Sequence, residues 1–188
     1  MPVAETASIF NEQVLAAAAL KRASDAQERL ALLENKIQDA CQIICDIYSR
    51  YRFETELFSR RENEFMFPDT LCQMMLAAQD EAYGDGLDPV LRHPYMWACK
   101  GHYYSTGLSF YNFPYAFGGL FARGLYAKYM AEGAPFVPKY KALLRATTVN
   151  TVEDTAAMAD INLADIDFWR SGLQSIADEI DEYIALLK

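Results

Sequence analysis

Val3-Ala-Glu-Thr-Ala-Ser-Ile-Phe-Asn-Glu12 is the stretch of sequence from which the fold is best predicted. It leads into an alanine-rich run that ends near Ala23. Alanine has the highest helix propensity and is small enough to let a neighbouring helix approach closely. We therefore expect a first helix over residues 3–23. No later segment alternates apolar and polar residues for long, as a half-buried strand would, so the chain is predicted to be all-α.

A second, long helix is predicted to begin after Asp25, which offers an N-cap with Glu28 three residues later, as in a capping box. We expect this helix to end at about Arg60. Its apolar stripe is predicted to consist of Leu30, Leu33, Ile37, Ile44 and Tyr51. Charged residues on the opposite face are interpreted as solvated and without chemistry: Glu34, Lys36, Asp39, Asp46 and Arg50.

Helix signals continue through the rest of the chain. Pro68 suits a first helical turn and Gly84-Asp-Gly86 a C-terminal stop, so a helix is expected over residues 68–83. The aromatic region of residues 96–130 is expected to form two or more helical pieces. The breaks are predicted at Gly101, Gly107, Pro114, Gly118 and Gly119. Further helices are expected over residues 136–146, from residues 151–154 onward, and over residues 165–187.

Composition limits the classes of protein that this chain can represent. Its 188 residues are 52% hydrophobic, with only nine glycines and seven prolines, which predicts one helical domain over residues 1–188. A formal net charge of -9 argues against nucleic acid and anionic membrane surfaces as partners. The sequence has no apolar run of about 18 residues and no signal peptide, so we expect a cytoplasmic location.

The four cysteines do not predict a metal site or a disulfide framework. The cysteines are Cys41, Cys45, Cys72 and Cys99, and no two of them form a C-x-x-C pair. Cys41 and Cys45 lie four residues apart on the predicted long helix and are interpreted as small buried hydrophobes.

The histidines exclude one kind of zinc site within this chain. A catalytic zinc ion takes three protein ligands, and in many peptidases two of them are the histidines of H-E-x-x-H on one helix. This motif is absent, and the only histidines are His93 and His102. They lie nine residues apart, next to Pro94 and Gly101, so they cannot occupy neighbouring turns of one helix face. No local zinc site of that kind is expected.

The first stretch nevertheless resembles a zinc-binding segment. Residues 3–12 match the pattern V-A-E-x-A-S-x-x-N-E of oligoendopeptidase F, in the wider thimet oligopeptidase family of zinc metallopeptidases. The resemblance implies that Glu5 is the third zinc ligand and that Glu12, two turns further on, supports it. Alternatively, Glu5 is an ordinary first-turn glutamate that the helix dipole favours.

A second segment carries the same resemblance. Members of the family have H-x-Y followed by F-Y-x-[FY]-x-Y-A, and this chain has His102-Tyr-Tyr104 and Phe110-Tyr111-Asn-Phe-Pro-Tyr115-Ala116. By resemblance, His102 hydrogen-bonds the substrate backbone or the tetrahedral intermediate, and Tyr111 or Tyr115 donates its phenol to the oxyanion. The choice between the two tyrosines stays open. The other aromatic residues here are expected to be core: Tyr103, Phe110, Phe113 and Phe117.

The resemblance covers almost the whole chain and implies the C-terminal part of a zincin-like oligopeptidase catalytic domain. Such an enzyme hydrolyses short peptides with zinc as its cofactor. Because H-E-x-x-H is absent, this chain alone is expected to be inactive and to retain zinc weakly. The expected partners are short peptide substrates and a missing N-terminal catalytic half. Self-association through exposed helix faces is also expected, with residues 14–20 as the first candidate.

Two other classes of function use helical folds of this size. A stand-alone, non-catalytic helical module that binds peptides or another protein remains an alternative. A di-iron helical bundle needs Glu-x-x-His pairs on facing helices, and neither His93 nor His102 has a glutamate three residues earlier. The di-iron class is therefore set aside.

Overall fold

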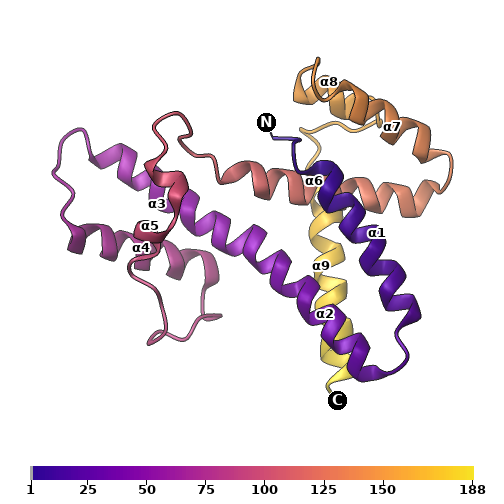
Figure 1. Cartoon of the computed structure of the whole chain (residues 1–188), viewed down its shortest axis with the longest axis horizontal. Helices are drawn as coiled ribbons and strands as arrows, with labels where there is room; N and C mark the ends of the chain where they lie inside the picture. The colour runs from indigo at the N-terminus through magenta and orange to yellow at the C-terminus, as the bar shows by residue number, and fades with distance from the viewer. Residues whose placement is uncertain (1) are drawn as a thin grey trace. The chain divides into compact units, whose positions relative to one another are not determined.

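The computed structural model describes residues 2–188 and is built of helices, with no strand in that range (Figure 1). The all-α prediction is confirmed. In chain order the elements are α1 (Thr6–Arg22), α2 (Ala26–Cys41), the π-helical turn η1 (Gln42–Asp46), α3 (Ile47–Arg60), α4 (Pro68–Tyr83), α5 (Met96–Cys99), the 3-10 turn η2 (Gly101–Tyr104), α6 (Phe113–Glu132), α7 (Phe136–Ala146), α8 (Val152–Ala157) and α9 (Ile166–Leu186).

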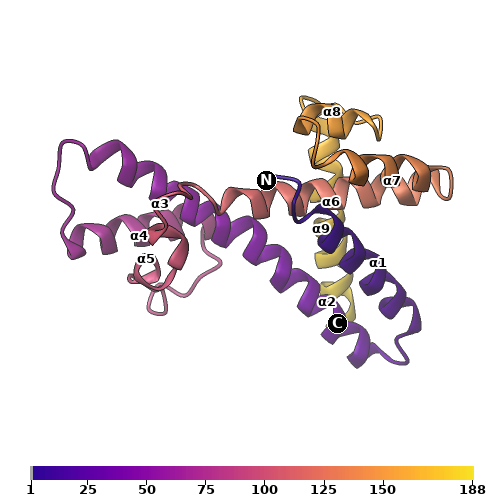
Figure 2. The ribbon, with the colours of Figure 1, turned by 45° about the horizontal axis from the view of Figure 1, so that its top comes forward.

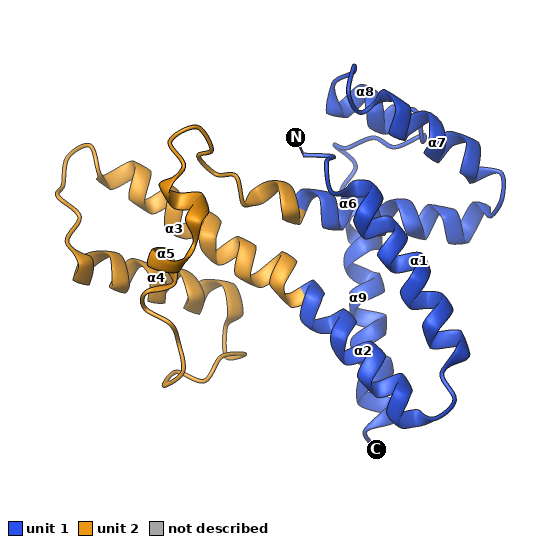
Figure 3. Cartoon of the chain, in the orientation of Figure 1, with its two compact units in different colours: residues 1–40, 117–188 blue, residues 41–116 orange. Residues whose placement is uncertain are grey.

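The chain divides into two compact units, coloured separately in Figure 3. The first unit consists of Met1–Ala40 and Phe117–Lys188, and the second of Cys41–Ala116. The expectation of a single domain over residues 1–188 stays a prediction. No helix within residues 2–188 combines the length and the apolar run needed to cross a lipid bilayer.

The end points of α4 and the start of α2 lie where the local sequence signals predicted them. Helix α4 begins at Pro68 and stops before Gly84, which has a φ of 56°. That φ lies in the left-handed region that glycine tolerates. At the start of α2, the Glu28 N–H donates to Asp25 Oδ1 at 2.9 Å, and Glu28 Oε2 accepts from the Ser24 N–H at 2.7 Å. The capping interaction predicted for Asp25 and Glu28 is confirmed.

The predicted break at Gly118 and Gly119 is wrong, because α6 runs through both residues. Pro114 is the second residue of α6, where the missing N–H of proline is not needed. In α6, glycine lets neighbouring segments pack closely and does not form a turn. A Cβ atom at Gly118 would lie 3.1 Å from Glu5 Cβ, and one at Gly124 would lie 2.5 Å from the Phe168 ring.

The long helix differs from the prediction in which residues it buries. Its backbone continues from α2 through η1 into α3, and the π-turn changes the angle by which successive residues rotate. Tyr51, predicted for the apolar stripe, is 42% exposed. Asp46 and Arg50, predicted to be solvated, are 8% and 4% exposed and form an ion pair. The interpretation of that face as solvated is therefore wrong at Asp46 and Arg50.

The cysteines also differ from the expectation. All four are free thiols, Cys41 and Cys99 are exposed, and Cys45 and Cys72 are half-buried. Cys41 is thus not core, because it lies on the solvent side of α2. Burial, with the neighbouring Cys41 thiol as a smaller cause, raises the pKa of the Cys45 thiol to about 11.

The first unit has an aromatic core. Phe121 and Phe136 are fully buried, and the Phe121 ring packs edge-on against Phe168 with centroids 5.7 Å apart. Phe10 of α1 stacks on Tyr140 of α7 with centroids 4.2 Å apart. Helices α7 and α8 lie side by side in the views of Figures 1 and 2. These contacts fix α1, and with it the segment that carries Glu5.

Candidate functional site

The second unit provides the frame of the candidate site. Helices α3 and α4 pack side by side and bury Phe53, Met74, Met75 and Ala78. Tyr103 packs on this core with its ring centroid 5.3 Å from that of Phe53, as predicted for a core aromatic. Phe113 is 44% exposed, so its prediction as core is wrong. It opens α6, where its side chain lies at the surface.

Three of the residues singled out from the sequence lie together in the second unit. The His102 ring stacks on Tyr111, with centroids 5.5 Å apart and an interplanar angle of 20°. The Tyr115 ring lies 6.1 Å from His102 and 6.0 Å from Tyr111, edge-on to both. His102 belongs to η2, Tyr111 to the following turn, and Tyr115 to the first turn of α6. An imidazole and two phenols are therefore gathered in one place.

His102 and Tyr115 line an open cavity of about 530 Å³. The other lining residues are Gln42, Ile43, Ile47, Arg50, Cys99, Lys100 and Gly101. The cavity thus combines an apolar strip with hydrogen-bond donors, which is the usual character of a small-ligand site.

Tyr111 is held by its two neighbours in the chain. The Phe110 N–H donates to Glu54 Oε1 at 2.8 Å, and Arg50 Nη1 donates to Asn112 Oδ1 at 3.0 Å. Phe110 has a φ of 57°, a conformation that costs free energy in a residue with a bulky side chain. Two residues one turn apart on α3 thus fix the backbone on either side of Tyr111.

The residues that hold Tyr111 were missed from the sequence. Arg50, Glu54 and Asn112 are 4%, 4% and 1% exposed. Desolvation raises the pKa of the Glu54 carboxyl, while the Phe110 N–H, Asn112 and the His102 imidazole oppose that rise. The spacing of Asp46, Arg50 and Glu54, four residues each, places polar groups on one face of the continuous helix formed by η1 and α3. That repeat was the available signal, but it does not tell whether the face is buried.

Glu5 lies in the first unit, at the N-cap of α1. Its backbone carbonyl accepts from the Ser8 hydroxyl at 2.9 Å, and its carboxylate Oε2 lies 3.2 Å from the same hydroxyl. Its side chain is half-buried, whereas Glu12 is exposed. Within residues 2–188 no three His, Cys, Asp or Glu side chains gather where a metal ion could bind. The residues of this chain alone therefore do not fit a zinc site, and the ligand role of Glu5 stays a prediction.

The arrangement can bind a polarised oxygen through donors that α3 holds in position. Phenol O–H and imidazole N–H groups donate hydrogen bonds, and donors fixed beforehand stabilise a developing oxyanion more than mobile ones do. The three rings are packed against one another, and Tyr111 is held at both sides. The catalytic roles of His102 and the two tyrosines stay predictions.

The fold is that of the oligoendopeptidase-F peptidases. The crystal structure of oligoendopeptidase-F from Enterococcus faecium matches 99% of this chain with a TM-score of 0.84 and 19% sequence identity. The chain is homologous to oligopeptidase PepF from Bacillus subtilis (strain 168), with 24% identity over 186 residues. The resemblance seen in the sequence is thereby confirmed. No protein-family model matches the chain.

This chain spans only part of each relative. It covers 27% of the length of PepF and 35% of the solved oligoendopeptidase-F chain. Homology to PepF supports an origin among peptidases.

Proposed function

We propose that this chain is the C-terminal part of a zinc metalloendopeptidase that hydrolyses short peptides. Its role is to supply one metal ligand and the wall of donors that stabilises the oxyanion. The observation that carries the proposal is the packing of His102, Tyr111 and Tyr115 around one another beside an open cavity. Homology to PepF along 98% of the chain supports it independently.

In this proposal His102 hydrogen-bonds the substrate backbone or the tetrahedral intermediate. One of the two tyrosines donates to the oxyanion, and the other orients its neighbours by ring packing. Tyr111 has the more rigid backbone, because Phe110 and Asn112 on either side of it are hydrogen-bonded to α3. Tyr115, however, lines the cavity together with His102, whereas Tyr111 is not among the lining residues. The choice between the two tyrosines therefore stays open.

Glu5 is proposed as one zinc ligand of the complete enzyme. The other two ligands belong to an H-E-x-x-H helix that residues 1–188 lack. A single carboxylate holds zinc weakly, so the chain alone is expected to be inactive. A cytoplasmic location is part of the same proposal.

The exposed face of α1 is proposed to meet the N-terminal catalytic half. Leu15 is 71% exposed on the face of the helix opposite the buried Ile9 and Phe10, and Val14 is 40% exposed at the edge of the buried face. Apolar side chains left in water on one helix face favour association. In the absence of that half, we expect the same face to support self-association.

Hydrolysis of an internally quenched short peptide tests the proposal. The chain would be assayed alone and with the polypeptide encoded immediately upstream, with zinc content measured in both samples. We expect activity and bound zinc only in the combined sample. Glu5→Gln should then remove the zinc, and His102→Ala should lower kcat by about 10²-fold to 10³-fold. Tyr111→Phe and Tyr115→Phe identify the oxyanion donor, with Tyr95→Phe, an exposed tyrosine of the second unit, as the control.

Two results would contradict parts of the proposed function. If no H-E-x-x-H segment precedes this chain and the chain alone binds short peptides without cleaving them, the non-catalytic module is the correct function. Unchanged zinc content in Glu5→Gln would remove the ligand role of Glu5 without affecting the assignment of the His–Tyr cluster.

A further inference from the structure

The cavity beside His102 has two basic side chains in its lining, Arg50 and Lys100, and no acidic one. The remaining lining residues are Gln42, Ile43, Ile47, Cys99, Gly101, His102 and Tyr115. The chain as a whole has a net charge of -9. Such a lining favours an anionic ligand.

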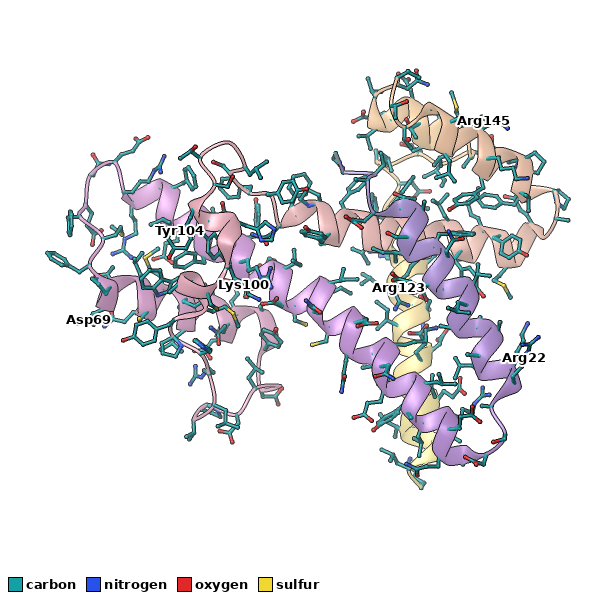
Figure 4. All side chains as sticks on the ribbon, in the orientation of Figure 1. Arg22, Asp69, Lys100, Tyr104, Arg123 and Arg145 are labelled. Atoms are coloured by element: carbon teal, nitrogen blue, oxygen red, sulfur yellow. The ribbon has the colours of Figure 1, made fainter. Side chains whose placement is uncertain are left out.

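Lys100, labelled in Figure 4, is half-buried and forms no ion pair with any of residues 2–188. In that same range, every other buried or half-buried lysine or arginine is ion-paired: Arg29, Lys36, Arg50, Arg52, Arg60, Arg92, Arg123, Lys128 and Lys139. Partial removal of an ammonium group from water costs free energy that a nearby anion offsets. Lys100 is therefore the cation that a bound anion would pair with.

Arg50, the other basic residue of the lining, already has its partners. It is 4% exposed, forms an ion pair with Asp46 and donates Nη1 to Asn112. Lys100 therefore carries the uncompensated positive charge of this lining.

We propose that this cavity binds the C-terminal carboxylate of a short peptide, with Lys100 as its ion-pair partner. The inference rests on the peptidase function proposed above and adds which end of the substrate the site recognises. Ile43 and Ile47 form the apolar part of the same lining and suit an apolar terminal side chain.

Binding of two matched peptides to the 188-residue chain tests the proposal. One is a fluorescent pentapeptide that ends in leucine with a free carboxylate, and the other is the same peptide with a C-terminal amide. We expect the amide to bind about tenfold more weakly in fluorescence anisotropy, because it lacks a charge-assisted bond. Lys100→Met should remove the difference between the two peptides, and Lys100→Arg should restore it. Lys141→Met, at an exposed lysine of α7, is the control and should leave the difference unchanged.

The outcomes separate this inference from the proposed function. Equal affinity for the free acid and the amide, with measurable binding of both, overturns the carboxylate site and leaves peptide binding intact. A preference for the free acid that survives in Lys100→Met overturns the role of Lys100. Failure of both peptides to bind overturns the carboxylate site together with peptide recognition by this chain.

Discussion

The two compact units differ in the kinds of side chain that they bury. The first unit buries mainly apolar and aromatic side chains, and its buried Arg123 is matched by Ser175 and Glu179. Within residues 2–40 and 117–188, the buried side-chain atoms without a hydrogen-bond partner are the hydroxyls of Thr6, Tyr140 and Thr155. The corresponding atoms of the second unit are Arg50 Nε, Glu54 Oε2, Trp97 Nε1, Tyr103 Oη and Asn112 Nδ2.

The groups that are costlier to leave without a partner lie in the second unit. Buried guanidinium, carboxylate and amide groups with unmet hydrogen bonds cost more than neutral hydroxyls do. In native proteins such groups have a specific explanation, such as a bound water molecule or a role in a site. In this chain they lie around His102 and Tyr111, while the first unit supplies the packing that holds Glu5.

The largest expected effect comes from the core of the first unit. Phe121→Ala removes a fully buried ring and should lower the free energy of unfolding by about 3–5 kcal/mol. Each unit contains one tryptophan, Trp97 in the second and Trp169 in the first. Urea unfolding followed by Trp169 fluorescence in a Trp97→Phe background reports the first unit, and the reciprocal background reports the second. A loss below about 1 kcal/mol would contradict the assignment of Phe121 to the core.

The same pair of probes tests the prediction of a single domain. If residues 1–188 unfold as one domain, Phe121→Ala should shift the Trp97 transition as far as the Trp169 transition. A shift confined to Trp169 would show that the two units unfold separately.

A smaller effect is expected from the buried ion pair of the second unit. Asp46→Asn leaves the Arg50 guanidinium without its counter-charge and should destabilise the second unit by about 3 kcal/mol in urea unfolding followed by Trp97. The matched control is Asp167→Asn, because the Arg170–Asp167 pair is 68% and 78% exposed. That change should cost at most about 0.5 kcal/mol. Equal effects of the two substitutions would show that burial of the Asp46–Arg50 pair has no energetic consequence.

The sequence predicted those parts of the fold whose signals are local. Pro68 and Gly84 bound α4 because proline and glycine act on the backbone beside them. Asp25 caps the long helix through a residue three positions away. Glu5, His102, Tyr111 and Tyr115 were singled out by resemblance to a known family, since none of them has a local signal of its own.

What the sequence could not predict depends on partners far along the chain. Arg50 is buried because Asn112, 62 residues later, accepts its hydrogen bond, and Glu54 because it accepts from Phe110. Nothing within α3 distinguishes these residues from solvated charges. The packing role of Gly124 likewise could not be predicted, because it depends on the ring of Phe168 on another helix.

Close packing at Gly124 in the first unit predicts a further, smaller loss of stability. At Gly124 a Cβ atom would lie 2.5 Å from the Phe168 ring, so Gly124→Ala should destabilise the first unit by about 1–3 kcal/mol despite the higher helix propensity of alanine. At Gly107, in the second unit, a Cβ atom would meet nothing within 4 Å. Gly107→Ala should therefore change the free energy of unfolding by less than about 0.5 kcal/mol. A neutral Gly124→Ala would mean that the Phe168 ring moves aside freely.

The smallest expected effect is a pH dependence that belongs to the second unit alone. Because desolvation raises the pKa of Glu54 above its usual 4.5, the folded state binds a proton more tightly than the unfolded state does. By linkage, the stabilising contribution of this proton is fully present below pH 4.5 and is lost as pH rises through the folded-state pKa. Glu54→Gln keeps an oxygen that can accept from the Phe110 N–H but cannot titrate. The difference in unfolding free energy between the wild type and Glu54→Gln, followed by Trp97, should therefore shift against the wild type as pH rises from 4.5. A difference that stays constant, or changes in favour of the wild type, would show that interactions with Phe110, Asn112 and His102 outweigh desolvation at this carboxyl group.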